Sequence, residues 1–211
     1  LLEDNDKDKI DLSQIIKNHK KIISIFPGSR QSEINVLLPI LIDFVKMMNE
    51  KYKDIFFVFH PTSEHNKLIQ ARLIKEGFKN CGSISDEKIK SQILKSSIFA
   101  VSKSGTISLE ICNSKVPSII IYKMNSINFF IVKMLVKVKF ANIINIAAGE
   151  EIIPELLQSN CNAKNIFNNV SRLLEDQNSL QKQINNSQEI ISKFKTDQSS
   201  EIAASILSNS F

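Results

Sequence analysis

The sequence of 211 residues predicts an α/β fold in which helices cover both faces of a doubly wound parallel sheet. Short apolar runs that suit strands alternate with longer segments of helical periodicity, in the order βαβαβαβαβ. Residues 55–59 are apolar at every position, which is typical of a strand buried on both faces of a parallel sheet. Turn residues follow several of these strands directly, at the sheet edge where such folds bind ligands.

Composition narrows the class of protein. Hydrophobic residues make up 43% and charged residues 23%, as in soluble globular proteins. The three cysteines, Cys81, Cys112 and Cys161, lie far apart without a CxxC pair, which predicts neither a zinc site nor a disulfide framework and favours a reducing compartment. No apolar run approaches about 18 residues and the N-terminus is acidic and polar, so we expect neither a transmembrane helix nor a signal peptide.

The charge balance indicates anionic partners. The net charge is +5 and the isoelectric point is near 9.0. Because the lysines are not interleaved with aromatic residues, nucleic acid is not the expected partner. Phosphates or anionic lipid satisfy the charge equally well.

The first ordered elements frame a candidate phosphate loop. Residues 1–20 are polar and charged and predict a linker or the remnant of a preceding domain, with a short helix around 12–17; the start at Leu1 suggests part of something longer. Residues 22–26 form a strand that Pro27-Gly28-Ser29-Arg30 ends abruptly. An apolar stripe at helical spacing follows over 34–48, and Pro39 within it predicts a kink or a late helix start.

Two interpretations of Pro27-Gly28-Ser29-Arg30 stay open on the residues alone. In one, the turn is a phosphate loop, and Arg30 forks onto a pyrophosphate. In the other, it is a plain turn whose arginine is solvated.

The middle of the chain continues the alternation. The strand at 55–59 ends at His60-Pro61-Thr62, a helix over about 64–76 ends at Gly77, and a short strand near 82–84, a helix over about 86–95 and strands at 98–101 and 117–122 follow. His60 lies at a strand end and could line a pocket. A structural role is favoured for all three histidines, since no metal-ligand spacing joins them.

A second strand-turn-helix boundary lies at residues 104–110. Gly105 can adopt backbone geometry or close approach that a side chain would forbid, and Thr106 suits a helix N-cap. Ser104, Gly105 and Thr106 therefore form a candidate phosphate cradle at a helix N-terminus. Glu110 comes one residue too late for a capping box but can reach back to the same site, where a carboxylate suits a ribose diol. The alternative is an ordinary capped helix with an exposed glutamate.

The candidate residues converge, because the carboxyl ends of parallel strands share one edge of the sheet. Residues 27–30, His60-Pro61, residues 102–106 and Lys123 should all lie there. This convergence carries more weight than any single loop.

The last third of the chain breaks the pattern. Residues 127–139 are apolar with lysines, which suits either a core helix, the favoured interpretation, or an interfacial helix against anionic lipid. Pro154 is placed for the first turn of a new helix. We expect one domain over 21–175 and C-terminal helices over 176–211, with a long exposed helix of modest packing over 177–199.

Three blocks resemble the lipid-A-disaccharide synthases, family 19 glycosyltransferases of the two-domain GT-B type. Residues 26–34, FPGSRQSEI, are similar to the family's Leu-Pro-Gly-Ser-Arg-x-x-Glu-Ile, and residues 104–110 to its Ser-Gly-Thr-x-x-Leu-Glu. A third block, comprising residues 117–123, Val136-Lys137, Asn145 and the Pro-Glu-Leu-Leu-Gln run at 154–158, follows the family's order. Ile144 departs from the proline usual before the asparagine.

The resemblance implies the Rossmann-like C-terminal, donor-binding domain of a GT-B enzyme. It implies transfer of 2,3-diacylglucosamine from its UDP derivative to 2,3-diacylglucosamine 1-phosphate with release of UDP, without a metal or other cofactor. Gly28, Ser29, Arg30, Ser104, Gly105 and Thr106 would bind the pyrophosphate, Glu110 the ribose and Asn145 another part of the substrate. Arg30 would also be catalytic, by stabilising charge on the leaving UDP.

The resemblance also implies partners and a location. The family's N-terminal domain, expected to supply the general base and the acceptor-lipid site, is absent from this sequence. The enzyme would work on the cytoplasmic side, peripherally on the anionic inner face of the inner membrane, and a homodimer is allowed. Two alternatives remain: a UDP-binding or membrane-binding module without catalysis, and another GT-B enzyme, such as a UDP-N-acetylglucosamine 2-epimerase or a peptidoglycan transferase.

Overall fold

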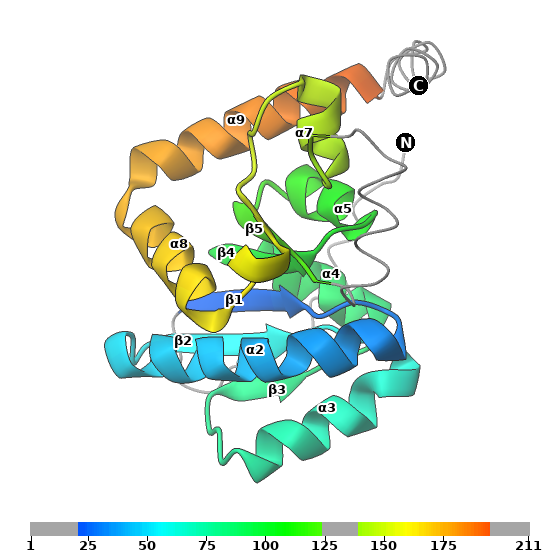
Figure 1. Cartoon of the computed structure of the whole chain (residues 1–211), viewed down its shortest axis with the longest axis vertical. Helices are drawn as coiled ribbons and strands as arrows, with labels where there is room; N and C mark the ends of the chain where they lie inside the picture. Colours follow the sequence, from blue (N-terminus) through cyan, green and yellow to red (C-terminus); the bar gives the residue numbers. More distant parts are fainter. Residues whose placement is uncertain (1–20, 124–138, 195–211) are drawn as a thin grey trace, which may run out of the picture.

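The structure, a computed structural model, describes residues 21–123 and 139–194 (Figure 1). Within these residues one sheet has six strands in the order β3-β2-β1-β4-β5-β6, and every pairing is parallel. The strands are β1 Lys21–Phe26, β2 Ile55–Phe59, β3 Cys81–Ser83, β4 Phe99–Lys103, β5 Ser118–Tyr122 and β6 Glu155–Leu157. The order reverses between β1 and β4, which places the topological switch point there.

Helices lie on both faces of this sheet. They are α2 Gln31–Lys51, α3 Ser63–Lys75, α4 Glu87–Lys95, α5 Ile107–Asn113, α7 Ile143–Ala148, α8 Ala163–Glu175 and α9 Gln177–Phe194, with a 3₁₀ turn, η2, at Gln158–Asn160. Ile23 and Ile25 of β1 face a core built with α2, α3 and α8. Ile22 and Phe26 face the other side, where α4 and α5 pack. The alternation along β1 confirms the doubly wound α/β fold.

The buried strands fall where the apolar runs predicted them, whereas the structure excludes one of the two alternatives at Pro39 and contradicts the helix expected at Pro154. Helix α2 begins at Gln31 and runs through Pro39, so a late start is excluded. Pro39 lies on the exposed side of the helix, where water can bind the carbonyl that the missing N–H leaves free. Residues after Pro154 form strand β6 rather than a helix: Glu155 pairs with Ile120, whose N–H donates to the Pro154 carbonyl over 2.9 Å.

The C-terminal helix packs more closely than predicted. Helix α9 buries Leu180, Ile190 and Ile191. The buried Gln183 binds both backbone groups of Ser118 in β5, accepting from its N–H over 2.7 Å and donating to its carbonyl over 2.9 Å. The α9 helix is therefore attached to the sheet through hydrogen bonds as well as apolar contacts.

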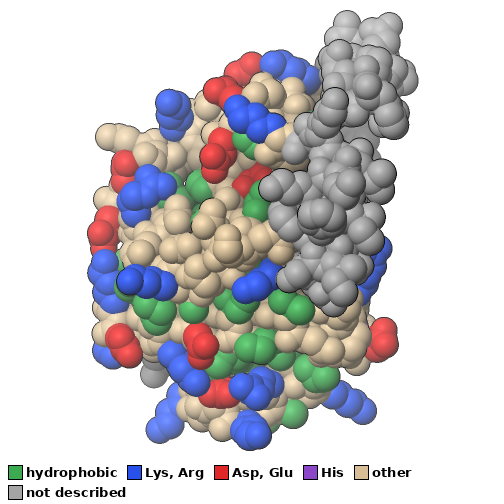
Figure 2. Space-filling model, in the orientation of Figure 1, with side chains coloured by type: hydrophobic (Ala, Val, Ile, Leu, Met, Phe, Trp, Pro, Cys, Tyr) green, Lys and Arg blue, Asp and Glu red, His purple; other side chains and the backbone are tan. Residues whose placement is uncertain are grey.

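Some predictions fall on residues outside the described ranges. They are the helix at 12–17, the apolar and basic segment up to residue 138, and the chain after residue 194. On the face drawn in Figure 2, Lys and Arg side chains are spread over the surface among Asp and Glu. Within the described ranges, no helix has the length and apolarity needed to cross a membrane.

Candidate functional site

A cavity of about 250 Å³ opens at the carboxyl ends of β1, β2 and β4. Its lining includes Gly28 and Ser29 from the first loop (residues 27–30), and Ser104, Gly105 and Thr106, which form the second loop. His60 and Pro61 contribute from the end of β2, and Glu110 from α5. The predicted convergence is confirmed for these residues. The lining does not include Pro27, Arg30, Ser102 or Lys123. Nζ of Lys123 donates instead to the Cys161 carbonyl over 3.4 Å.

The first loop is closed by its own carboxylate. Oε2 of Glu33, in the first turn of α2, accepts from the N–H of Ser29 over 3.1 Å and from the N–H of Arg30 over 3.3 Å. A helix N-terminus offers unpaired N–H groups, and an acidic side chain stabilises it. The backbone N–H groups of Ser29 and Arg30 are therefore already satisfied within the chain.

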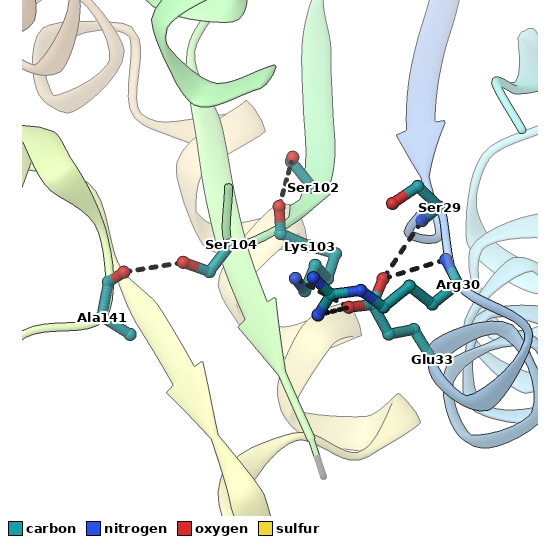
Figure 3. Close-up of polar contacts among 7 residues, drawn as sticks. All are labelled: Ser29, Arg30, Glu33, Ser102, Lys103, Ser104 and Ala141. Carbon is teal, nitrogen blue, oxygen red and sulfur yellow. Dashed lines mark hydrogen bonds and ion pairs between the residues drawn. The ribbon is translucent and has the colours of Figure 1, made fainter. Parts of the chain in front are cut away.

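Two cations meet at the other oxygen of Glu33 (Figure 3). Nζ of Lys103, the last residue of β4, lies 3.0 Å from Oε1, whereas a terminal nitrogen of Arg30 lies 3.7 Å from it. Partial burial by itself raises the pKa of Glu33, but Lys103 and the N–H groups of Ser29 and Arg30 outweigh it and hold the pKa below its usual value. The carboxylate is therefore ionised and anchors both cations.

The second loop is braced from within and from the residues just before α7. The hydroxyl of Ser104 donates to the Ala141 carbonyl over 2.7 Å (Figure 3), and that of Ser108 donates to the Gly105 carbonyl over 2.7 Å. Thr106 is the N-cap residue of α5, as predicted, but its side chain makes no capping hydrogen bond. Its backbone is already helical, with φ of −61° and ψ of −24°.

Neither of the two reasons expected for a glycine at position 105, unusual backbone geometry or close packing, applies among the described residues. Its φ lies outside the left-handed region, and a Cβ at this position would meet nothing within 4 Å. The space above it opens to the cavity that it lines. Among the described residues, nothing approaches this position closely enough to require a glycine.

Glu110 is paired with a lysine from the opposite wall. Nζ of Lys90, in α4, lies 3.4 Å from Oε2 of Glu110 and also forms an ion pair with Glu87. Burial lowers the pKa of Lys90, but the two carboxylates outweigh that effect and raise it above its usual value. Glu110 remains half-exposed at the cavity, so a hydroxyl could reach it.

His60 forms part of the cavity wall as a neutral side chain. It is 6% exposed, stacks on Phe26 with ring centroids 4.7 Å apart, and its Nε2 lies 3.1 Å from the Ser24 hydroxyl. Burial, together with the nearby charge of Lys90, lowers its pKa to about 3. His60 therefore has both the structural role and the place in the pocket that the sequence suggested.

Asn145 lies apart from the cavity and is fully buried. Its Nδ2 donates to the Ile153 carbonyl over 2.7 Å and to Glu155 over 2.8 Å, and its Oδ1 accepts from the N–H groups of Ile152 and Ile153, each over 2.9 Å. No group of this amide is left for a ligand. The expected direct substrate contact is therefore replaced by a positioning role.

That positioning role extends to the second loop. The Glu155 carboxylate accepts from the N–H of Ala141 over 2.7 Å and from that of Asn142 over 2.9 Å. Ala141 in turn holds the Ser104 hydroxyl. The third motif block thus supports the second loop from behind.

Sequence reasoning placed Lys103 at this edge of the sheet, within residues 102–106, without giving it a role, and it missed Lys90. Both line the cavity.

Across residues 21–123 and 139–194, no cluster of three or more His, Cys, Asp or Glu side chains could hold a metal ion.

The fold matches those of a solved glycosyl transferase domain and a solved epimerase. The C-terminal domain of a Group 1 family glycosyl transferase from Francisella tularensis aligns with a TM-score of 0.59 and 17% identity, covering 85% of this chain and 88% of that one. The UDP-GlcNAc 2-epimerase from Neisseria meningitidis, bound to UDP-GlcNAc, aligns with a TM-score of 0.57 and 18% identity, covering 87% and 47%. The fold defined by the sheet order and its cavity is that of the Rossmann-like domains of GT-B glycosyltransferases.

Sequence comparison identifies the family. The family described as Lipid-A-disaccharide synthetase matches residues 2–209. The lipid-A-disaccharide synthase of Rickettsia prowazekii is 37% identical over 213 residues, covering 97% of this chain and 55% of the relative, and that of Sulfurihydrogenibium sp. is 35% identical, covering 83% and 46%. The chain belongs to the lipid-A-disaccharide synthase family, and it spans about half the length of these relatives.

Proposed function

We propose that this chain is the donor-binding half of a lipid-A-disaccharide synthase and that its cavity holds the UDP of the donor. The observation that carries the proposal is that the two loops resembling the family's motifs line one cavity at the switch point of the sheet. Ligands of open parallel sheets bind at this place. Family membership favours this function over that of the epimerases, which share the fold at under 20% identity.

The residues can be given roles along the donor. Arg30 would contact the pyrophosphate, the second loop would face it across Gly105, and the Glu110 carboxylate would accept hydrogen bonds from the ribose hydroxyls. In the reaction, the bond between the sugar C1 and the UDP oxygen breaks while a β-1,6 bond forms to 2,3-diacylglucosamine 1-phosphate. Arg30 would stabilise the negative charge that develops on the leaving UDP, an electrostatic contribution to catalysis.

The remaining partners belong to the same proposal. They are the lipid acceptor, an N-terminal half that supplies the general base, a second copy of the chain, and the anionic inner face of the inner membrane. The lysine-rich segment at 127–139 motivates the membrane contact. Anionic vesicles should sediment this chain more than neutral vesicles do, and salt should weaken the effect. Equal sedimentation with both would contradict the contact.

Calorimetric titration of UDP and uridine into the 211-residue chain tests the function. We expect saturable, weak UDP binding and weaker uridine binding, because uridine lacks the phosphates that the first loop would attract. Since half the relatives' length is outside this chain, mixing it with donor and acceptor should give no transfer. Absence of saturable UDP binding would overturn the donor-site proposal, and turnover by these residues alone would contradict the division into halves.

A further inference from the structure

Lys103 stands between the two loops, and no expectation drawn from the sequence assigned it a role. Phe26, the last residue of β1, pairs with Ser102, so Lys103 lies beside the start of the first loop. The next residue, Ser104, begins the second loop. Lys103 also lines the cavity. Its position follows from the parallel register of β1 and β4.

The ammonium group of Lys103 is held in place before any ligand arrives. Nζ lies 3.0 Å from Oε1 of Glu33 and 5.4 Å from the centroid of the Tyr122 ring. The Lys103 side chain is 20% exposed, whereas that of Arg30 is 80% exposed. A lysine loses much rotamer freedom when it is fixed, so prior fixation lowers the entropic cost of binding.

Two backbone donors of the first loop are already used within the chain. The N–H groups of Ser29 and Arg30 already donate to Glu33, and Glu33 packs against Gly28. This side of the cavity also carries positive charge: Lys103 belongs to its lining, whereas Arg30 lies outside the lining, is 80% exposed and reaches within 3.7 Å of Glu33. A ligand with two adjacent anionic groups would match two cations better than a ligand with one.

We propose that Lys103, positioned by Glu33, binds the diphosphate together with Arg30 and makes the site prefer a nucleoside diphosphate to the monophosphate. This inference rests on the proposed donor site. Glu33 is then a positioning residue, because it touches the cation rather than the ligand. The competing explanation is that the Lys103–Glu33 pair only ties β4 to α2.

The test compares UDP, UMP and uridine in calorimetric titrations of Lys103→Met, Lys103→Arg and the unchanged chain. Lys103→Met should weaken UDP by about tenfold or more, since a charge-assisted bond is lost, weaken UMP less and leave uridine unchanged. Lys103→Arg should restore most of the UDP affinity. Lys51→Met is the matched control, because Lys51 also pairs with a carboxylate, Glu175, and lies 5.2 Å from a tyrosine ring centroid, but away from the cavity.

A second measurement needs no variant. Mild acetylation of the unchanged chain, read by mass spectrometry, should show Lys103 protected by UDP and not by uridine, while Lys51 reacts equally with both. Equal labelling of Lys103 in the presence of UDP and of uridine would overturn the inference. So would a folded Lys103→Met protein whose ratio of UDP affinity to UMP affinity equals that of the unchanged chain. If the unchanged chain binds no UDP, the proposed function fails and this inference fails with it. If it binds UDP but Lys103 is indifferent, only the inference fails.

Discussion

A Cβ on Gly28 would lie 2.5 Å from Oε2 of Glu33, closer than such contacts occur in proteins. Gly28 also has φ of +106°, which residues with a side chain rarely adopt. The position of the Glu33 carboxylate, five residues along the chain, therefore requires a glycine at position 28. The carboxylate can seal the loop only because the glycine leaves room for it.

Replacing Gly28 with Ala should destabilise the fold by roughly 1–3 kcal/mol, because the backbone is strained and Glu33 must leave its N–H partners. Urea denaturation with the slope held constant measures the change. Gly105→Ala is the matched control, because the added Cβ would meet nothing within 4 Å. The free energy of unfolding of this variant should stay within about 0.5 kcal/mol of that of the unchanged chain. If a ligand approaches this backbone closely, Gly105→Ala should still weaken UDP. Equal destabilisation by both changes would contradict this account of the first loop.

Arg30→Ala should weaken UDP by roughly 1.5–3 kcal/mol while barely altering uridine, because a charge-assisted hydrogen bond to phosphate is lost. Stability should change little, since the Arg30 side chain is exposed and lies 3.7 Å from its only carboxylate among the described residues. Calorimetry of both ligands decides it. If Arg30→Ala weakened uridine as much as UDP, the assignment of Arg30 to the phosphate would be wrong.

Glu110→Ala should weaken UDP and uridine alike, because both carry the ribose. Binding of 2′-deoxyuridine should be insensitive to the change if the 2′-hydroxyl is the partner of Glu110. Glu87→Ala is the matched control, because Glu87 also pairs with Lys90 and lines the cavity. Calorimetric titration of the three ligands into both variants separates the effect of Glu110→Ala from that of Glu87→Ala. Unchanged affinities in Glu110→Ala, or equal effects of the two variants, would rule out the ribose assignment.

His60 should make the fold sensitive to mild acid. Its folded-state pKa of about 3 lies below the ordinary value of 6.5, so below pH 6.5 the unfolded chain binds the extra proton and the folded chain does not. Stability should therefore fall as the pH drops from 6.5 towards 3, by up to about 1.4 kcal/mol per pH unit from this group. The stability difference between the unchanged chain and His60→Gln should shrink over that range in urea denaturation, while the carboxylate contributions cancel. A constant difference would contradict a buried neutral imidazole.

The sheet was predictable because its inner strands are buried on both faces, and such strands show as continuous apolar runs like residues 55–59. Strand β6 was missed for the opposite reason. It has only three residues, Glu155–Leu157, and its pairing with β5 decides its structure. A proline at its start suits a helix's first turn equally well, so local chemistry could not distinguish the two.

The two loops were predictable from turn chemistry at strand ends, but their internal contacts were not. The ion pair between Glu33 and Lys103 depends on the register of β1 against β4, because 70 positions of sequence separate the two residues. The burial of Asn145 was likewise hidden, since its four partners lie in residues 152–155 and face it only after the chain turns. Tertiary contacts, over 70 positions for Glu33 and over 7 to 10 positions for Asn145, rather than residue type, fixed these roles.

The hydrogen bond from Ser104 to Ala141, with Glu155 and Asn145 behind it, bears on how such a domain could be re-engineered. Transplanting residues 104–110 into another Rossmann-like scaffold would carry the loop without its brace. A transplant that runs from Ser104 to Glu155 would include the residues that make this brace. Chimeras that exchange donor specificity between GT-B proteins should therefore place their junctions outside these limits.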